Sequence, residues 1–130
     1  MYRGTHHFFD FENFTNDMFD DEKKANIIFN LMQTSITLLS NMKIVHKHLE
    51  ILKQPNTENG FTCVLLLDES HMTAHAYTDN DKAMLAMDLF TCGNTDTQKI
   101  CDYIISSIKI MFPNIINNNY KINKRFLKSK

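Results

Sequence analysis

The sequence contains few of the residues that interrupt regular structure, with three glycines and two prolines among 130 residues. We therefore expect few loops, most of them short. A chain of this length can fill one two-layer core but not two separate ones, which predicts a single domain over residues 1–130. Its three cysteines are an odd number and lack the spacing of a disulfide framework, so we expect free thiols in a reducing cytoplasm.

Long apolar stretches and an excess of one charge are also missing. The longest apolar runs, Cys63–Leu67 and Ala83–Met87, are far shorter than the roughly 20 residues that cross a membrane. Residues 1–7 lack the apolar stretch of a signal peptide. Fourteen basic and fifteen acidic side chains give a net charge of -1. This composition predicts a cytoplasmic globular protein with neither a nucleic-acid nor a membrane partner.

Two segments show the three- and four-residue spacing of apolar side chains that is typical of an amphipathic helix. The first covers about residues 20–42 and starts with three consecutive acidic residues, which suit a helix N-terminus. The second covers residues 95–112, where Thr95 and Gln98 have the spacing of a capping box and Pro113 ends the segment. Each helix is apolar on one face only, so each should cover one side of a sheet.

Six further segments have the apolar runs or the alternation that is typical of strands. They are His6–Phe14, Lys43–Leu52, Phe61–Asp68, His71–Tyr77, Ala83–Phe90 and Ile115–Ile122. The resulting order predicts an α+β fold, a two-layer sandwich of a mainly antiparallel sheet with two helices on one face. Since the other face would be uncovered, we expect a homodimer formed through it, in an αββα arrangement. Residues 121–130, five of which are basic, are expected to be a flexible, solvated tail.

Polar residues gather in the stretch Leu65–Gly93, between and at the ends of apolar strands. Ser70 and His71 lie between two predicted strands, His75 shares a strand face with His71, and Cys92 ends the next strand. If these strands pair, a hydroxyl, two imidazoles and a thiol converge in one pocket. A structural interpretation is also open, because Ser-His is common in turns and a cysteine at a strand end often only packs.

Two familiar kinds of site fit this stretch poorly. A Ser-His-Asp hydrolase is disfavoured because no G-x-S-x-G nucleophile elbow is present. A zinc site is disfavoured because His71, His75 and Cys92 lack the usual paired ligand spacing, and we expect no metal. The other histidines and cysteines are expected to be structural, on strand surfaces for His6, His7, His46 and His48 and in the core for Cys63 and Cys101.

Two motifs of this stretch resemble the prokaryotic-type S-adenosylmethionine decarboxylases, which are pyruvoyl-dependent proenzymes. They are E-S-H-M-T-A-H, beginning at Glu69, and D-L-F-T-C-G, beginning at Asp88. They match the family's E-S-H-x-x-x-H and D-x-F-T-C-G signatures in the same order and with nearly the same separation. The segment Gly4-Thr5-His6 and both predicted helices extend the resemblance over most of the chain.

The resemblance implies a self-processing enzyme that cleaves its own chain between Glu69 and Ser70. In the family the serine hydroxyl attacks the preceding carbonyl to give an ester, and elimination and hydrolysis then leave a pyruvoyl group at the new terminus. That group, formed here from Ser70, makes a Schiff base with the substrate and accepts the electrons left when CO2 departs. The resemblance assigns His75 to processing and Cys92 to proton donation, in a homodimer with its active site at the interface.

Several positions depart from the family's pattern. Thr62 stands where the family has a second processing serine; it keeps the hydroxyl but adds a methyl group. Tyr77 and Asp79 stand for the family's tryptophan and glutamate, so they would bind the adenine and ribose of the substrate, with Glu69 as a further substrate-binding candidate. The segment 49–56 offers no aromatic partner for the other face of adenine, a loss of about 1–3 kcal/mol of stacking.

These departures leave three functions open. The expected one is an S-adenosylmethionine decarboxylase that makes decarboxylated S-adenosylmethionine for spermidine biosynthesis. The second is a pyruvoyl decarboxylase of the same fold that acts on arginine or ornithine, which the weakened adenine pocket favours. The third is a homologue that does not process and acts as a regulatory subunit, which Thr62 and the altered loop favour.

Overall fold

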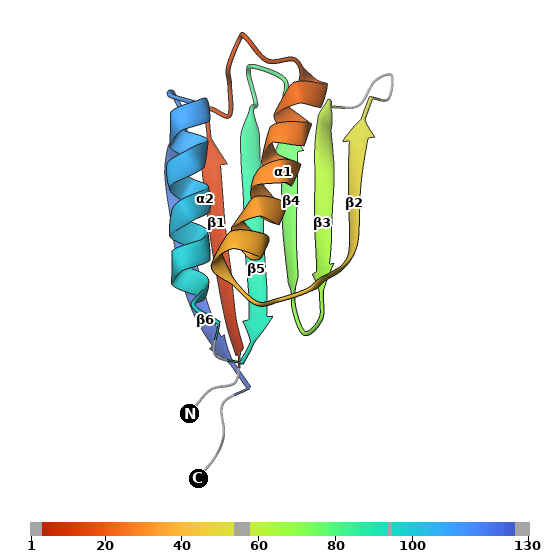
Figure 1. Ribbon diagram of the computed structural model, residues 1–130. Helices are drawn as coiled ribbons and strands as arrows, with labels where there is room; N and C mark the ends of the chain where they lie inside the picture. Colours follow the sequence, from red (N-terminus) through yellow and green to blue (C-terminus); the bar gives the residue numbers. More distant parts are fainter. Residues whose placement is uncertain (1–3, 54–57, 94, 127–130) are drawn as a thin grey trace.

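The computed structural model describes residues 4–53, 58–93 and 95–126, which form a sheet layer and a helix layer (Figure 1). The six strands are β1 (Gly4–Glu12), β2 (Ile44–Leu52), β3 (Gly60–Leu67), β4 (His71–Tyr77), β5 (Met84–Cys92) and β6 (Ile116–Arg125). The helices are α1 (Asp21–Leu39) and α2 (Thr97–Met111), and both lie on one face of the sheet. The predicted α+β sandwich is confirmed, with every expected helix and strand present.

All strand pairs are antiparallel, and the strands follow one another in the order β2-β3-β4-β5-β1-β6. The first strand thus lies between β5 and the last strand, so the two ends of the described chain meet at one edge of the sheet (Figure 1). Strands β3, β4 and β5 run up and down in the middle. This arrangement places the segments that carry Ser70 and Cys92 next to each other.

The core lies between the sheet and the helices, because alternate strand residues face the apolar stripes of α1 and α2. Its large, fully buried side chains include Phe9, Phe11, Phe61, Leu65, Met72 and Leu89 from the sheet and Ile28, Met32, Ile36, Ile104 and Ile108 from the helices. Cys63 and Cys101 are buried among them, as predicted, and burial raises the pKa of each thiol to about 12. All three cysteines are free. Neither described helix is long and apolar enough to cross a membrane.

Aspartates begin both helices. The Asp20 carboxylate caps α1 by accepting the third backbone N–H of the helix at 2.7 Å. In α2 the cap is Asp96, whose carboxylate accepts the Lys99 N–H at 3.1 Å, so the predicted capping box of Thr95 and Gln98 is wrong. The Gln98 amide donates instead to Asp102, 2.9 Å away. Asp96 caps the helix in place of Thr95, because its carboxylate accepts the Lys99 N–H directly.

The basic C-terminal segment is part of the sheet up to Arg125. Lys121, Lys124 and Arg125 belong to β6, which pairs with β1 from Gly4 to Glu12. The predicted tail over residues 121–130 is therefore wrong for its first half, while residues 127–130 lie outside the described residues. The reason is that β1 offers a complete hydrogen-bonding edge, and the Arg125 guanidinium also lies 5.1 Å from the centre of the Phe90 ring.

The two neighbouring histidines of β1 point to opposite faces of the sheet. His46 and His48 on β2 are exposed as predicted, but the prediction of a surface position is wrong for His7, which is 1% exposed. Its Nδ1 lies 2.9 Å from the Tyr120 hydroxyl, and its Nε2 lies 2.7 Å from the Thr97 hydroxyl. Burial and the neighbouring His6 lower the pKa of His7, so the folded protein favours the neutral imidazole.

This burial predicts a loss of stability in mild acid. Since the pKa of His7 is lower in the folded chain than its ordinary value of about 6.5, the unfolded chain takes up the proton first. The stabilisation is complete above about pH 6.5 and is lost as the pH falls through the folded pKa. Urea unfolding of a Ser70→Ala chain, expected to stay in one piece, should show a free energy of unfolding that decreases from about pH 7.5 to about pH 5.5.

His7→Gln should weaken this pH dependence because glutamine does not titrate. His48→Gln, which removes an exposed histidine, is the matched control and should leave the dependence unchanged. An equal pH dependence in the His7→Gln variant and its parent would contradict the assignment.

Candidate active site

The predicted site residues that belong to strands lie on the sheet face opposite the helices. Alternation along β3, β4 and β5 directs a set of polar and apolar side chains to this face: Thr62, Val64, Leu66, His71, Thr73, His75, Tyr77, Ala86, Asp88, Phe90 and Cys92. The strand register pairs Thr62 with His75 and Thr73 with Asp88. The prediction that His71 and His75 share one face is therefore confirmed.

Ser70 lies in the tight turn between β3 and β4. The Leu67 N–H donates to the Ser70 carbonyl at 2.9 Å, and the Ser70 N–H donates back to the Leu67 carbonyl at 3.4 Å. The serine is 7% exposed, whereas Glu69 before it is exposed. The peptide bond between these two residues thus joins an exposed turn residue to a buried, hydrogen-bonded one.

Cys92 ends β5 directly beside this turn. Its backbone N–H donates to the Ser70 hydroxyl oxygen at 3.2 Å, so the structure brings together the serine and the cysteine that the motifs predicted. The thiol is free and half-buried. Gly93, with a φ of 82°, lies in the left-handed region that glycine tolerates best, and the strand ends immediately before it. A hydroxyl and a thiol therefore share one end of the sheet.

Thr62 and His75 form a second group further along the strands. The Thr62 hydroxyl lies 3.2 Å from His75 Nδ1, and the imidazole is exposed. His75 follows Ser70 by five residues along β4, a distance of about 16 Å at roughly 3.3 Å per residue. Within one chain, the structure therefore does not bring the predicted processing pair to the serine.

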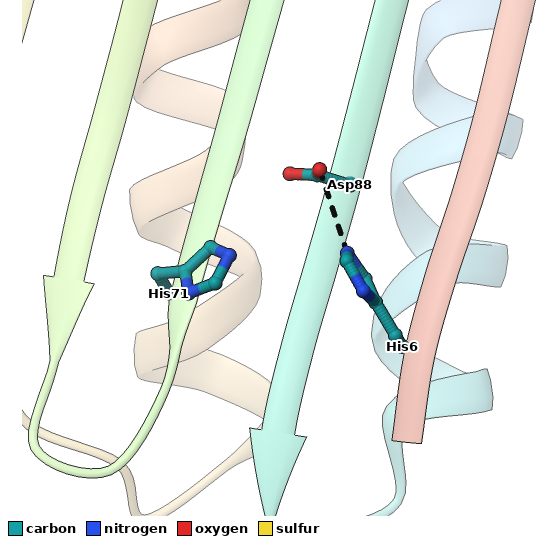
Figure 2. Close-up of side chains that lie close together, drawn as sticks. All are labelled: His6, His71 and Asp88. Atoms are coloured by element: carbon teal, nitrogen blue, oxygen red, sulfur yellow. Dashed lines mark ion pairs between the residues drawn. The ribbon is translucent and has the colours of Figure 1, made fainter. Parts of the chain in front are cut away.

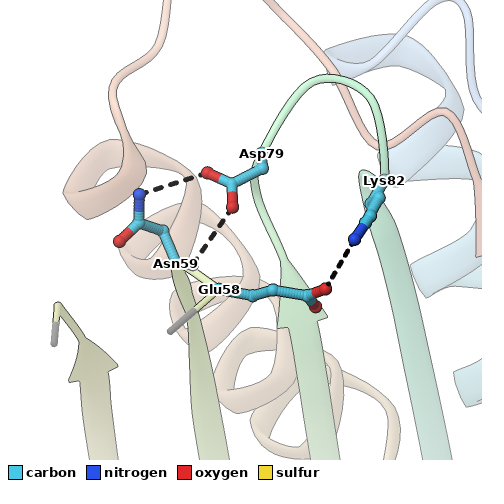
Figure 3. Close-up of polar contacts among 4 residues, drawn as sticks. All are labelled: Glu58, Asn59, Asp79 and Lys82. Carbon is cyan, nitrogen blue, oxygen red and sulfur yellow. Dashed lines mark hydrogen bonds and ion pairs between the residues drawn. The ribbon is translucent and has the colours of Figure 1, made fainter. Parts of the chain in front are cut away.

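Two of the predicted substrate-binding residues lie at the end of the sheet opposite Ser70, Tyr77 as the last residue of β4 and Asp79 in the loop after it, whereas Glu69 directly precedes Ser70. Tyr77 is 46% exposed. The Asp79 carboxylate accepts hydrogen bonds from the Asn59 backbone N–H at 3.4 Å and the Asn59 side-chain amide at 3.1 Å (Figure 3). An ion pair of 3.1 Å between Lys82 and Glu58 bridges the same two segments. Asp79 therefore has a structural role in joining the start of β3 to the loop after β4.

A cavity of about 300 Å³ opens beside this loop, lined in part by Asp17, Lys24, Thr78 and Asp79. The Thr78 hydroxyl is buried and has no hydrogen-bond partner among the described residues. Neither Asn59 nor this cavity was predicted from the sequence, because both arise where loops that are distant in the sequence meet.

Three further polar side chains converge over β5: His6 from β1, His71 from β4 and Asp88 from β5 itself (Figure 2). Their nitrogen and oxygen atoms lie within 4.8 Å of one another, with His6 Nε2 3.4 Å from Asp88 Oδ2. The Thr73 hydroxyl donates a hydrogen bond to Asp88 Oδ1. The His71 ring centre lies 5.7 Å from that of Phe90 and 6.1 Å from that of His6.

The predictions from the sequence do not include this cluster. His75 and Cys92 are the residues that the sequence offers beside His71 as zinc ligands, but the sheet brings His71 to His6 and Asp88 instead. The predicted surface position of His6 is wrong, because its side chain is 13% exposed and its Nε2 is buried. A signal was present, because all three residues stand within the segments that carry the family resemblance.

Comparison with known proteins agrees with the geometry. A sequence model of the family described as S-adenosylmethionine decarboxylase matches residues 5–115. The chain is 33% identical over 97 residues to S-adenosylmethionine decarboxylase proenzyme 2 of Bacillus cereus, covering 65% of this chain and 77% of the relative. It is 41% identical over 51 residues to the S-adenosylmethionine decarboxylase proenzyme of Brevibacillus brevis, covering 38% and 37% of the two chains.

A solved structure shows the same fold. The crystal structure of the adenosylmethionine decarboxylase from Aquifex aeolicus superposes with a TM-score of 0.71 at 22% identity, covering 99% of this chain and 95% of that one. The segment matched by the family contains every predicted site residue, from Thr62 to Cys92. The shared fold, the paired motifs and the family match lead to one conclusion: this chain belongs to the S-adenosylmethionine decarboxylase family.

Proposed function

We propose that this protein is a pyruvoyl-dependent S-adenosylmethionine decarboxylase that cleaves itself between Glu69 and Ser70. Its product would be decarboxylated S-adenosylmethionine for spermidine biosynthesis. The observation that carries the proposal is the 3.2 Å hydrogen bond from the Cys92 N–H to the Ser70 hydroxyl oxygen. In a chain of this family, it joins the serine at the proposed cleavage site to the proposed proton donor.

The geometry around Ser70 suits self-cleavage. The serine oxygen would attack the Glu69 carbonyl carbon, which shifts the acyl group from nitrogen to oxygen and frees the amine. Loss of the Cα proton then expels the Glu69 carboxylate, and water replaces the nitrogen, which leaves as ammonia. The exposed position of Glu69 in the turn gives water access to this bond. The pyruvoyl group so formed supplies an electron sink for decarboxylation.

Cys92 is the proposed acid of the decarboxylation step. Once CO2 has left, the substrate carbon needs a proton, and a thiol can donate one as a general acid. The half-buried thiol lies on the residue whose N–H contacts the serine. The buried thiols of Cys63 and Cys101 belong to the core and are unsuited to this role.

The processing pair of Thr62 and His75 would act on a second copy of the chain. The distance of about 16 Å along β4 separates His75 from the serine of its own chain. Leu66, Tyr77 and Met84 expose 48%, 46% and 46% of their surface on the sheet face opposite the helices, which favours its burial against a partner. An αββα homodimer related by a two-fold axis would bring one copy's His75 toward the other's Ser70.

For the nucleoside part of the substrate we propose Tyr77 and Asp79, and we propose Glu69, beside the reactive serine, as a further substrate contact. The exposed Tyr77 ring is free to stack on adenine. Asp79 is held in place by Asn59 and lines a cavity, so it presents a carboxylate at a fixed position. The cytoplasmic location and the absence of a metal cofactor remain predictions. Assays with S-adenosylmethionine, arginine and ornithine should detect turnover of the first substrate only.

Cleavage can be tested by intact mass under denaturing conditions. The purified protein should give two pieces that divide between Glu69 and Ser70, the second carrying a carbonyl that borohydride reduces. Ser70→Ala should remain one chain because the attacking oxygen is gone. Ser106→Ala, which changes an exposed serine on α2, is the control and should cleave normally. Cleavage of the Ser70→Ala chain at the same bond would contradict the mechanism.

Cys92→Ala should separate cleavage from turnover. Because the thiol is the proposed acid, the processed variant should decarboxylate S-adenosylmethionine about 10²- to 10⁴-fold more slowly, the range for loss of general acid catalysis. Cys63→Ala, a buried thiol, should lower stability but not the turnover per folded molecule. Full activity of processed Cys92→Ala would rule out the proton-donor role.

Mixing two inactive variants tests the shared active site. Ser70→Ala lacks the serine and His75→Ala lacks the processing imidazole, so neither homodimer should cleave efficiently. In a mixed dimer, the His75→Ala chain should be cleaved with the help of its partner's His75. His75→Ala mixed with the double variant that carries both Ser70→Ala and His75→Ala is the negative control, because neither chain then has His75. If native mass spectrometry shows mixed dimers while the His75→Ala chain stays whole, the interface site is wrong.

A further inference from the structure

The self-processing that we propose would remove the peptide bond before residue 70 and two of its three hydrogen bonds, so the inference below rests on the proposed function. In the uncut chain, residue 70 is held by its peptide bond to Glu69 and by three backbone or hydroxyl hydrogen bonds. Conversion of the serine replaces its nitrogen by oxygen and removes its hydroxyl. The hydrogen bonds from the Ser70 N–H to Leu67 and from the Cys92 N–H to the Ser70 hydroxyl are then lost.

Only one of these contacts is preserved. The Leu67 N–H donates to the residue 70 carbonyl at 2.9 Å, and that carbonyl is retained in the cleaved chain. The reactive group therefore stands at the free end of β4 at the moment when its position beside Cys92 matters most. A displacement of about 1 Å at such a group can slow a reaction by about 10²-fold.

The cluster of His6, His71 and Asp88 includes the residue that follows Ser70, and it contains no atom that cleavage changes. The Thr73 hydroxyl donates to Asp88 Oδ1, and His6 Nε2 lies 3.4 Å from Asp88 Oδ2, within ion-pair distance although this buried nitrogen makes no hydrogen bond. Thr73 is three residues after the cleaved bond's serine, and Asp88 is four residues before Cys92. The carboxylate thus ties the strand that begins with the reactive group to the strand that ends with the thiol.

His71 extends the cluster to the residue next to the new terminus. Its ring packs against Phe90 and meets the edge of the His6 ring. Figure 2 shows His71 on β4 and His6 on β1, on the two sides of the strand that carries Asp88. The side-chain surface exposed is 13% for His6 and 29% for Asp88, so these polar contacts are partly shielded from water, which strengthens them.

We propose that His6, His71, Thr73 and Asp88 form a clamp that positions the chain end created by self-cleavage beside Cys92. They are positioning residues, because they act through β4 and β5. Before cleavage, the peptide bond and the turn hydrogen bonds already hold residue 70, so the clamp adds little. After cleavage it is a side-chain connection between β4 and β5 that the reaction leaves unchanged, so it matters for turnover more than for cleavage.

Thr73→Val tests the clamp most directly, because valine keeps the branched shape and removes the hydroxyl donor. The rate of cleavage, followed by intact mass, should stay within about twofold of the wild type. The kcat of the processed variant should fall about ten- to a hundredfold with a smaller change in KM. Thr73→Ser should restore most of the kcat, and Thr37→Val, an exposed threonine on α1, should behave like the wild type.

A second measurement does not depend on activity. Amide hydrogen exchange of β4 should be faster in processed Thr73→Val than in the processed wild type. In a Ser70→Ala background, which keeps the peptide bond, the same substitution should leave exchange in β4 unchanged. A merely structural role for Thr73 would speed exchange in both backgrounds.

Failure of the clamp can be told apart from failure of the proposed function. A wild type that does not cleave would overturn the proposed function and the clamp with it. A normal kcat in Thr73→Val, or a parallel loss of cleavage and kcat, would overturn the clamp alone. Because His6, His71 and Asp88 are residue types that bind zinc, the assay is repeated after EDTA treatment. A loss of turnover that zinc restores would replace the clamp by a metal site.

Discussion

The antiparallel pairing of β4 with β5 is the constraint on which the rest of the structure depends. Its register sets His71 opposite Phe90 and Thr73 opposite Asp88, and so brings the turn at Ser70 to the end of β5. A slip by one residue would turn every side chain to the other face of the sheet. The apolar residues that β4 and β5 bury beneath the helices prevent that slip, so core packing determines the geometry of the site.

The two faces of the sheet give the same residue types different chemistry. His7 points to the helices, where burial lowers its pKa and two hydroxyls hold it, while His6 points to the other face and meets Asp88. Burial likewise raises the pKa of Cys63 to about 12, whereas Cys92 is half-buried at a strand end. The side chains proposed to react are therefore those that the helix layer does not cover.

The length of β4 separates the proposed chemistry into two groups. One end holds the serine and the cysteine, and the other holds Thr62, His75 and the exposed Tyr77. An extended strand cannot fold back on itself, so two groups about 16 Å apart along it meet only through a second copy. Pairing of two sheets would therefore account both for the apolar side chains on the sheet face opposite the helices and for the divided active site.

The sequence by itself determined the α+β sandwich, both helices, all six strands and the pairing of Ser70 with Cys92, because apolar periodicity and local motifs record contacts between nearby segments. Only the tertiary structure decided that β1 lies between β5 and β6, and this single placement accounts for the main errors. It buries His7 under α2, brings His6 to Asp88 and His71, and makes residues 121–125 a strand. Periodicity shows that a strand has two faces, but it does not show which distant strand lies alongside, since that is decided by the packing of the whole sheet.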